Sequence, residues 1–209
     1  MTENKSLRLL ADLVSILFHP VFILPLAAAW IIYAMPSVRL SADPRHINLL
    51  FLSILLTDAM FPLVVVLLLK ALNMVQSIRL SNQRDRIIPY IATMTFYFWS
   101  WRVMKFLPYA PASLVALHFG AFLAVSMALV LNSFMKISMH AAGVGGLLAF
   151  VVAVTFTNDI SFIPLAAAAL ICGLVLTARQ LASDHTNREL ALGIAVGVVG
   201  QAIGFWIFA

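Results

Sequence analysis

The sequence predicts an all-α, polytopic membrane protein, and three observations support that fold class. Of the 209 residues, 63% are hydrophobic and only 10% are charged, whereas soluble domains carry about a quarter charged residues. The mean hydropathy is +1.04. Several apolar runs approach the roughly 20 residues that a helix needs to cross the hydrocarbon core. Lipid-exposed segments must pair their own backbone polar groups, so these runs are expected to be helices.

The apolar runs divide the chain into about six or seven expected spans within a single membrane domain, residues 1–209. In chain order they are 13–34, 47–69, 88–107, 112–133, 139–157, 160–178 and 190–208. The first is too long for a signal-peptide core and contains His19 and Pro20, so we expect a retained span. The third ends with Arg102 and Lys105, whose long side chains are expected to reach the membrane interface.

The breaks between the expected spans contain residues that favour turns. Proline follows the first and third runs, and Asn158-Asp159 separates the fifth run from the sixth. The single cysteine, Cys172, lies inside an apolar run, which excludes an intrachain disulfide. The net charge of +5 comes from cations scattered at the ends of apolar runs. This pattern favours anionic or phosphorylated lipids as partners and argues against nucleic acid.

Seven crossings would place three polar loops, 70–87, 134–138 and 179–189, on the same face of the membrane. Together these loops and the residues next to them bring cations, histidines and a carboxylate to that face. The candidate residues are Arg79, Arg86, Lys136, Ser138, His140, Arg179, His185 and Glu189. Arginine offers phosphate a planar fork of donors and lysine a compact charge, so the face is suited to phosphate binding.

His185 and Glu189 are four residues apart where the last span begins, a spacing that puts them on one helix face. A carboxylate beside one ring nitrogen fixes the tautomer and leaves the other nitrogen free to act as a nucleophile or base. Ser183 or Asp184 is expected to cap that helix, whose N-terminal amides favour an anion. Neighbouring cations are expected to keep His185 neutral.

The stretch Arg179-x5-His185-x3-Glu189 resembles the third signature, Ser-Arg-x5-His-x3-Asp, of the type-2 phosphatidic acid phosphatases. This lipid phosphate phosphatase family shares its site with vanadium haloperoxidases. Glu189 stands where the family has aspartate, and Ala178 where it has serine.

The other two family signatures also have counterparts, which extends the resemblance over residues 70–190. Ser138-Met139-His140 is similar to Pro-Ser-Gly-His, with methionine in place of glycine. Arg79-x6-Arg86 is similar to Lys-x6-Arg-Pro, with the proline displaced to Pro89.

The resemblance implies a phosphatase that acts on a phosphomonoester or pyrophosphate of a lipid, without metal or cofactor. His185 would form a phosphohistidine, Glu189 would orient it, and His140 would protonate the leaving oxygen. The phosphoryl oxygens would be held by Arg79, Arg86, Lys136, Ser138 and Arg179. Phosphatidate, phosphatidylglycerol phosphate, polyprenyl pyrophosphate and lipid A phosphates are the implied substrates, and a bacterial cytoplasmic (inner) membrane is the expected location.

Two other functions are considered for the same cationic face. One is a carrier or flippase that binds a lipid phosphate without hydrolysing it, and the other is a catalytically inactive relative. The distribution of lysine and arginine leaves the orientation in the membrane open. Asp58, near the middle of the second expected span, suits a functional role and a structural hydrogen bond equally, whereas His19 and His118 are expected to bond between helices.

Overall fold

A computed structural model of the chain describes residues 5–39, 43–78, 80, 82–158, 161–182 and 185–209. The described residues form helices and turns without a strand, which confirms the all-α fold class. The helices are α1 (Lys5–Leu17), α2 (Pro20–Ala29), α3 (Pro36–Arg39), α4 (Pro44–Ile54), α5 (Phe61–Ala71), α6 (Ile87–Met104), α7 (Ala112–Asn132), α8 (Met139–Thr157), α9 (Ile163–Leu181) and α10 (Asn187–Phe208). Short π-helical segments, η1 (Trp30–Ala34) and η2 (Leu55–Met60), extend α2 and join α4 to α5, and a 3₁₀ turn, η3 (Arg84–Arg86), precedes α6.

Five helices among the described residues are long and apolar enough to cross a membrane, and a bent pair could provide a sixth span. The five are Pro44–Ala71, which joins α4, η2 and α5, and the helices α7, α8, α9 and α10. The bent pair is Lys5–Leu17 with Pro20–Ala34, which meet at 53°. The expected third span is the helix α6, which lies beside α7 but is outside this set because its polar and aromatic residues lower its hydropathy.

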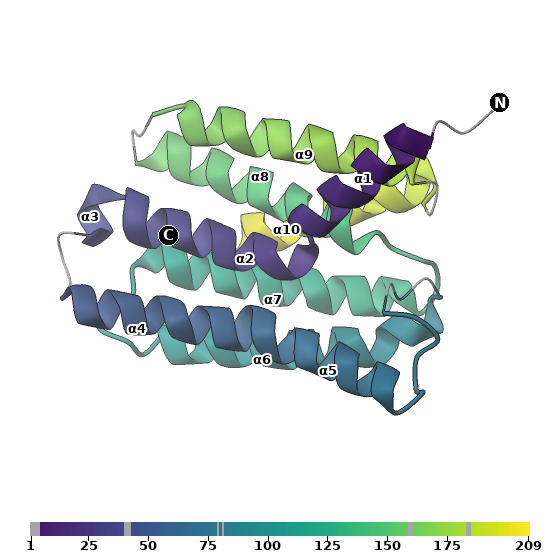
Figure 1. Cartoon of the computed structure of the whole chain (residues 1–209). Helices are drawn as coiled ribbons and strands as arrows, with labels where there is room; N and C mark the ends of the chain where they lie inside the picture. The colour runs from purple at the N-terminus through teal and green to yellow at the C-terminus, as the bar shows by residue number, and fades with distance from the viewer. Residues whose placement is uncertain (1–4, 40–42, 79, 81, 159–160, 183–184) are drawn as a thin grey trace.

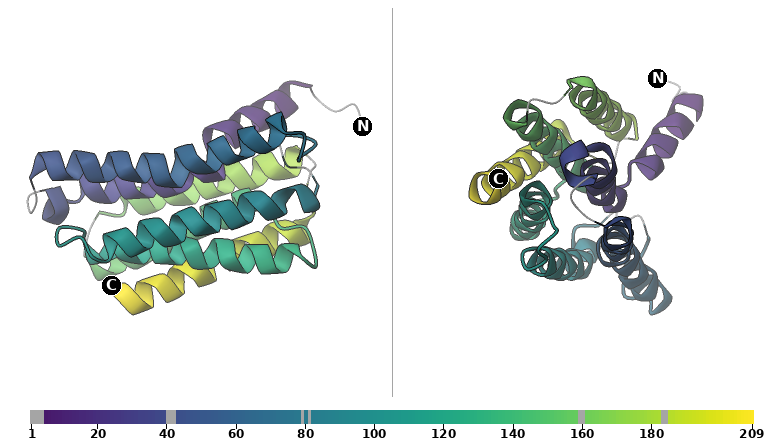
Figure 2. Two further views of the ribbon diagram at one scale, coloured as in Figure 1. Left: turned by 90° about the horizontal axis from the view of Figure 1, so that it is seen from below. Right: turned by 90° about the vertical axis from the view of Figure 1, so that its left-hand side faces the viewer.

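The long helices run roughly along one axis, and α10 packs against both α7 and α8 (Figures 1 and 2). Glycines make this close approach possible. A Cβ added to Gly200 would meet the Gly120 carbonyl oxygen of α7 at 2.7 Å, and one on Gly193 would meet the Ser138 carbonyl oxygen at the same distance. Both faces of α10 are therefore fitted to neighbouring backbones.

The first expected span is broken at His19, where α1 turns away from α2 and packs along α9 (Figure 1). The His19 Nδ1 atom accepts a hydrogen bond from the Val21 amide at 3.4 Å, and Pro20 occupies the first turn of α2. The expectation that His19 bonds between helices is therefore wrong: its side chain caps α2.

Candidate active site

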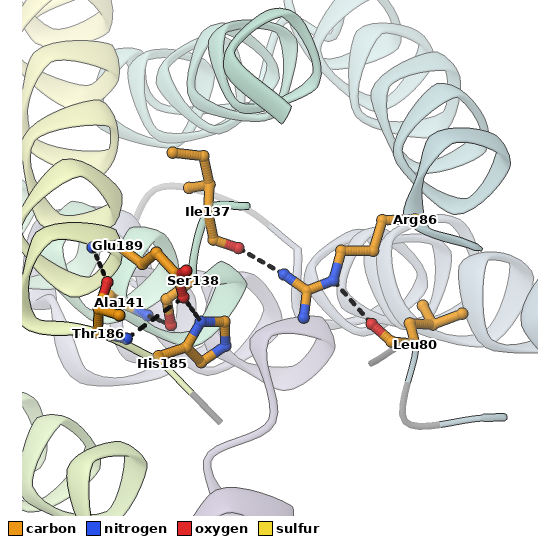
Figure 3. Close-up of polar contacts among 8 residues, drawn as sticks. All are labelled: Leu80, Arg86, Ile137, Ser138, Ala141, His185, Thr186 and Glu189. Atoms are coloured by element: carbon orange, nitrogen blue, oxygen red, sulfur yellow. Dashed lines mark hydrogen bonds and ion pairs between the residues drawn. The ribbon is translucent and has the colours of Figure 1, made fainter. Parts of the chain in front are cut away.

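The three polar loops meet at one end of the bundle, as the count of crossings predicted. The Arg86 Nη1 atom donates to the Ile137 carbonyl at 2.6 Å, which ties the first loop to the second (Figure 3). The Ser138 amide donates to the Glu189 carbonyl at 3.4 Å, which ties the second to α10. These two bonds confirm that the three loops lie at the same end of the bundle.

Three helices begin at this end: α6 after Arg86, α8 after Ser138 and α10 after Thr186. Their unpaired amides and aligned peptide dipoles make it electropositive, in addition to the charge of the cationic side chains. Ser138 caps α8 by accepting from the Ala141 amide at 3.4 Å, and it is fully buried. An anion is thus favoured here by the backbone as well as by side chains.

His185 and Glu189 form the expected pair, with the ring Nδ1 atom 2.7 Å from the carboxylate Oε2 atom (Figure 3). Because an ionised carboxylate only accepts, Nδ1 carries the hydrogen and Nε2 holds the lone pair. The His185 side chain is only 2% exposed, so its orientation is well constrained. The pair therefore has the arrangement of an oriented histidine nucleophile.

The pair is organised by a capping box rather than by the residues that the sequence suggested. Thr186 is the N-cap of α10 and accepts from the Glu189 amide at 3.3 Å, while Glu189 Oε2 accepts from the Thr186 amide at 3.4 Å. The expectation that Ser183 or Asp184 caps the helix is wrong, and both residues lie outside the described residues. His185 precedes the helix, and Glu189 reaches back to it from the first turn.

A cavity of about 370 Å³ opens beside His185 and combines a polar end with an apolar interior. Four predicted site residues line its polar end: Arg86, His140, Arg179 and His185. Further in, its walls are aliphatic side chains of α2, α5, α7 and α8, including Leu24, Val66, Leu117, Ala121 and Leu147. The shape matches an amphipathic molecule whose anionic group lies at the loop end.

The environment of His185 disfavours its protonated form. Burial is the largest cause, and together with the charges of Arg86, Lys136 and Arg179 it lowers the pKa of His185 to about 4. The hydrogen bond that His185 donates to Glu189 acts in the opposite direction and raises the pKa. His185 is therefore neutral at pH 7, as the sequence predicted, and its Nε2 lone pair is available.

Helix α1 contributes to the site, which sequence reasoning missed. The His140 Nε2 atom lies 3.0 Å from the Ser15 carbonyl oxygen, and because that oxygen only accepts, Nε2 carries the hydrogen. The Arg179 Nη1 atom donates to the Ser15 hydroxyl at 3.5 Å. The His19 ring lies edge-on to His140, with centroids 5.5 Å apart. A histidine next to a proline inside an apolar run was the one sequence signal for this contribution.

The remaining predicted phosphate-binding residues are Arg86, Lys136 and Arg79. Arg86 is 4% exposed and lines the cavity. Its Nε atom donates to the Leu80 carbonyl at 2.7 Å, so together with the bond to Ile137 it connects the first loop to the second. Lys136 is near enough to His185 to influence it electrostatically. Arg79 lies outside the described residues. Among the residues that are described, no group of three or more histidine, cysteine, aspartate or glutamate side chains is placed to hold a metal ion.

No family model, curated protein or solved structure matches this chain. The three motifs and the geometry of the cavity end are therefore the features that indicate a function for this chain.

The low pKa of His185 predicts an unusual pH profile for any reaction that needs its lone pair. We expect the acid limb of kcat/KM near pH 4 instead of near 6.5, the ordinary value for histidine. The variant Glu189→Gln should move this limb to still lower pH, because the bond to Glu189 is what raises the pKa of His185. Initial rates from pH 3.5 to about pH 8 test this, and an acid limb near 6.5 would contradict it.

The lowered pKa of His185 also makes the folding stability depend on pH. Below about pH 6.5 the unfolded chain protonates His185, whereas the folded chain does not until about pH 4. The contribution of His185 to folding stability should therefore fall as the pH drops from about 6.5 to about 4.

Proposed function

We propose that this protein hydrolyses a phosphate or pyrophosphate group from a membrane lipid through a phosphohistidine on His185. The observation that supports this best is the His185–Glu189 pair, which leaves Nε2 with a lone pair at the polar end of an amphipathic cavity. Three cations, Arg86, Lys136 and Arg179, act electrostatically on that histidine. The resemblance to the type-2 phosphatidic acid phosphatases points to the same residues.

In the proposed first step the Nε2 lone pair attacks phosphorus, and the bond between phosphorus and the lipid oxygen breaks with its electrons leaving on that oxygen. Glu189 stabilises the positive charge that develops on the His185 ring. The cations stabilise the charge that develops on the phosphoryl oxygens. Water then attacks the phosphohistidine, which releases phosphate and restores neutral His185.

His140 would protonate the leaving oxygen through its Nδ1 atom, because its Nε2 hydrogen is directed to the Ser15 carbonyl. His140 and Arg179 both contact Ser15, and beside a guanidinium the ring is neutral before substrate binds. The transferred proton therefore arrives with the substrate: a monoanionic phosphate gives its proton to Nδ1, and Nδ1 passes it to the leaving oxygen. The Ser15 carbonyl would hold the ring in place while that proton leaves. The first helix thus takes part in the proposed chemistry by positioning His140.

Release of inorganic phosphate by the purified full-length protein tests the proposal. Assays in excess EDTA should show hydrolysis of lipid phosphates, because none of the proposed steps uses a metal ion. If no phosphate is released while lipid phosphate moves between the leaflets of proteoliposomes, the carrier function holds instead. The absence of both activities would favour the inactive relative.

The cavity predicts that the apolar chain of the substrate contributes to binding. Ala121 on α7 lines the cavity and is 9% exposed, so Ala121→Leu should occupy space that a lipid chain uses. We expect kcat/KM for long-chain lipid phosphates to fall about tenfold or more, since each misfit methylene in such a pocket costs about 1–3 kcal/mol. A short, water-soluble phosphomonoester is the control, and its hydrolysis should be nearly unchanged. Equal losses for both substrates would exclude the cavity as the chain site.

A further inference from the structure

A second polar cluster lies inside the membrane-spanning part of the bundle and is made of residues that the proposed reaction does not use. The Asp58 Oδ2 atom of η2 lies 3.0 Å from the His118 Nε2 atom of α7 and accepts from the Ser100 hydroxyl of α6 at 3.1 Å. Asp58 and His118 are both 0% exposed, and Ser100 is 5% exposed. The expectation that His118 bonds between helices is confirmed, and Asp58 is its partner.

The hydrogen bonds determine how many protons this cluster contains. The His118 Nδ1 atom lies 2.8 Å from the Leu114 carbonyl oxygen, which only accepts, so Nδ1 carries a hydrogen. The contact between Asp58 and His118 then needs one further hydrogen. That hydrogen belongs either to a carboxylic acid that donates to a neutral ring or to an imidazolium that donates to a carboxylate. Both forms are neutral overall and contain the same single proton.

The surroundings disfavour any form with a different proton count. Losing the proton would leave a carboxylate beside a ring lone pair, and gaining another would leave a net positive charge, both without contact with water. Asp58 Oδ1 is buried and has no hydrogen-bond partner among the described residues, which further disfavours a bare carboxylate. Besides His118, Tyr97 of α6 interacts electrostatically with Asp58.

We propose that Asp58 and His118 form an intramembrane proton-binding site, which holds one shared proton as long as η2 stays packed against α6 and α7. This inference does not depend on the proposed hydrolysis. Separated in water, an aspartate and a histidine share no proton above about pH 6.5, where both ordinary pKa values have been passed. Assembly of the three helices therefore takes up one proton at neutral pH and above.

The variant Asp58→Asn removes the shared proton from the pair and so measures its effect on folding. Its side-chain amide can donate to His118 Nε2, which preserves the hydrogen bond without the shared proton. Above about pH 4 the unfolded states of the two proteins bind equal numbers of protons, whereas the folded wild type binds one more. The ratio of their folding equilibrium constants, wild type over variant, should therefore fall about tenfold for each unit that the pH rises. Contributions from other groups, including His185, cancel in this ratio.

Reversible unfolding of both full-length proteins in detergent, from about pH 5 to about pH 9, provides the measurement. A tenfold fall per unit supports the site, and a ratio independent of pH overturns it. If Asp58→Asn does not fold, the double variant Asp58→Leu with His118→Leu replaces the pair by apolar side chains of similar size. The ratio of folding equilibrium constants, wild type over double variant, should be constant below about pH 6.5 and should fall about tenfold for each pH unit above it. A constant ratio above 6.5 would again exclude the shared proton.

Discussion

Replacing His185 with alanine should abolish the release of phosphate, with a loss of at least about 10⁴-fold in kcat, because it removes the proposed nucleophile. Thr186 and Glu189 would still cap α10 in the variant, so the fold should be retained. The measurement is phosphate release at pH 7 in excess EDTA. Trapping with labelled substrate should detect an acid-labile phosphoenzyme in the wild type and not in His185→Ala.

His46 offers a matched control for this substitution. It lies on α4 at the opposite end of the bundle, exposed, with its ring stacked on Tyr109 at a centroid distance of 5.2 Å. The variant His46→Ala should hydrolyse lipid phosphate at nearly the wild-type rate. Unchanged hydrolysis in His185→Ala would rule out the phosphohistidine mechanism, whereas similar losses in both variants would point to a general effect on folding.

The variant Gly197→Ala should produce the largest loss of stability among single-methyl additions to α10. A Cβ at this position would overlap the Ala142 carbonyl oxygen and come within 2.6 Å of the Gly146 nitrogen, both backbone atoms of α8. Backbone atoms in a packed helix cannot move aside as a flexible side chain does, so α8 and α10 would have to separate. We expect a loss of about 3 kcal/mol in unfolding free energy.

Gly173 of α9 is the matched control, since a Cβ there would meet no atom within 4 Å. Alanine is the better helix former by about 1 kcal/mol, so Gly173→Ala should leave stability unchanged or raise it. Thermal or denaturant unfolding of the two variants in the same detergent gives the comparison. Equal stability of Gly197→Ala and Gly173→Ala would show that α8 and α10 are not packed as closely as described. Because Ser138 caps α8 and Glu189 lies on α10, we also expect Gly197→Ala to lose hydrolytic activity.

Much of the candidate site could be predicted because its evidence is local. The pairing of His185 with Glu189 follows from a four-residue spacing next to a helix start, where short-range geometry brings the side chains together. The shared face of the three loops follows from the number of apolar runs between them. Both predictions depend on the spacing of residues and on the length of apolar runs, which can be read directly from the sequence.

Contacts between distant segments depended on the tertiary structure. His140 meets Ser15, 125 residues away, and Asp58 meets His118, 60 residues away. Such contacts require each helix to have a particular rotation and depth, which are set by the packing of all its neighbours.

The sequence by itself therefore determined that this is a helical membrane protein and which loops carry the candidate phosphate-binding residues, because hydropathy and spacing are properties of short segments. The tertiary structure decided that α1 contributes to the site, that Thr186 and Glu189 close the capping box around His185, and that one intramembrane carboxylate is paired with a histidine. These features arise where helices meet, and glycines such as Gly193 and Gly197 determine how closely they do so.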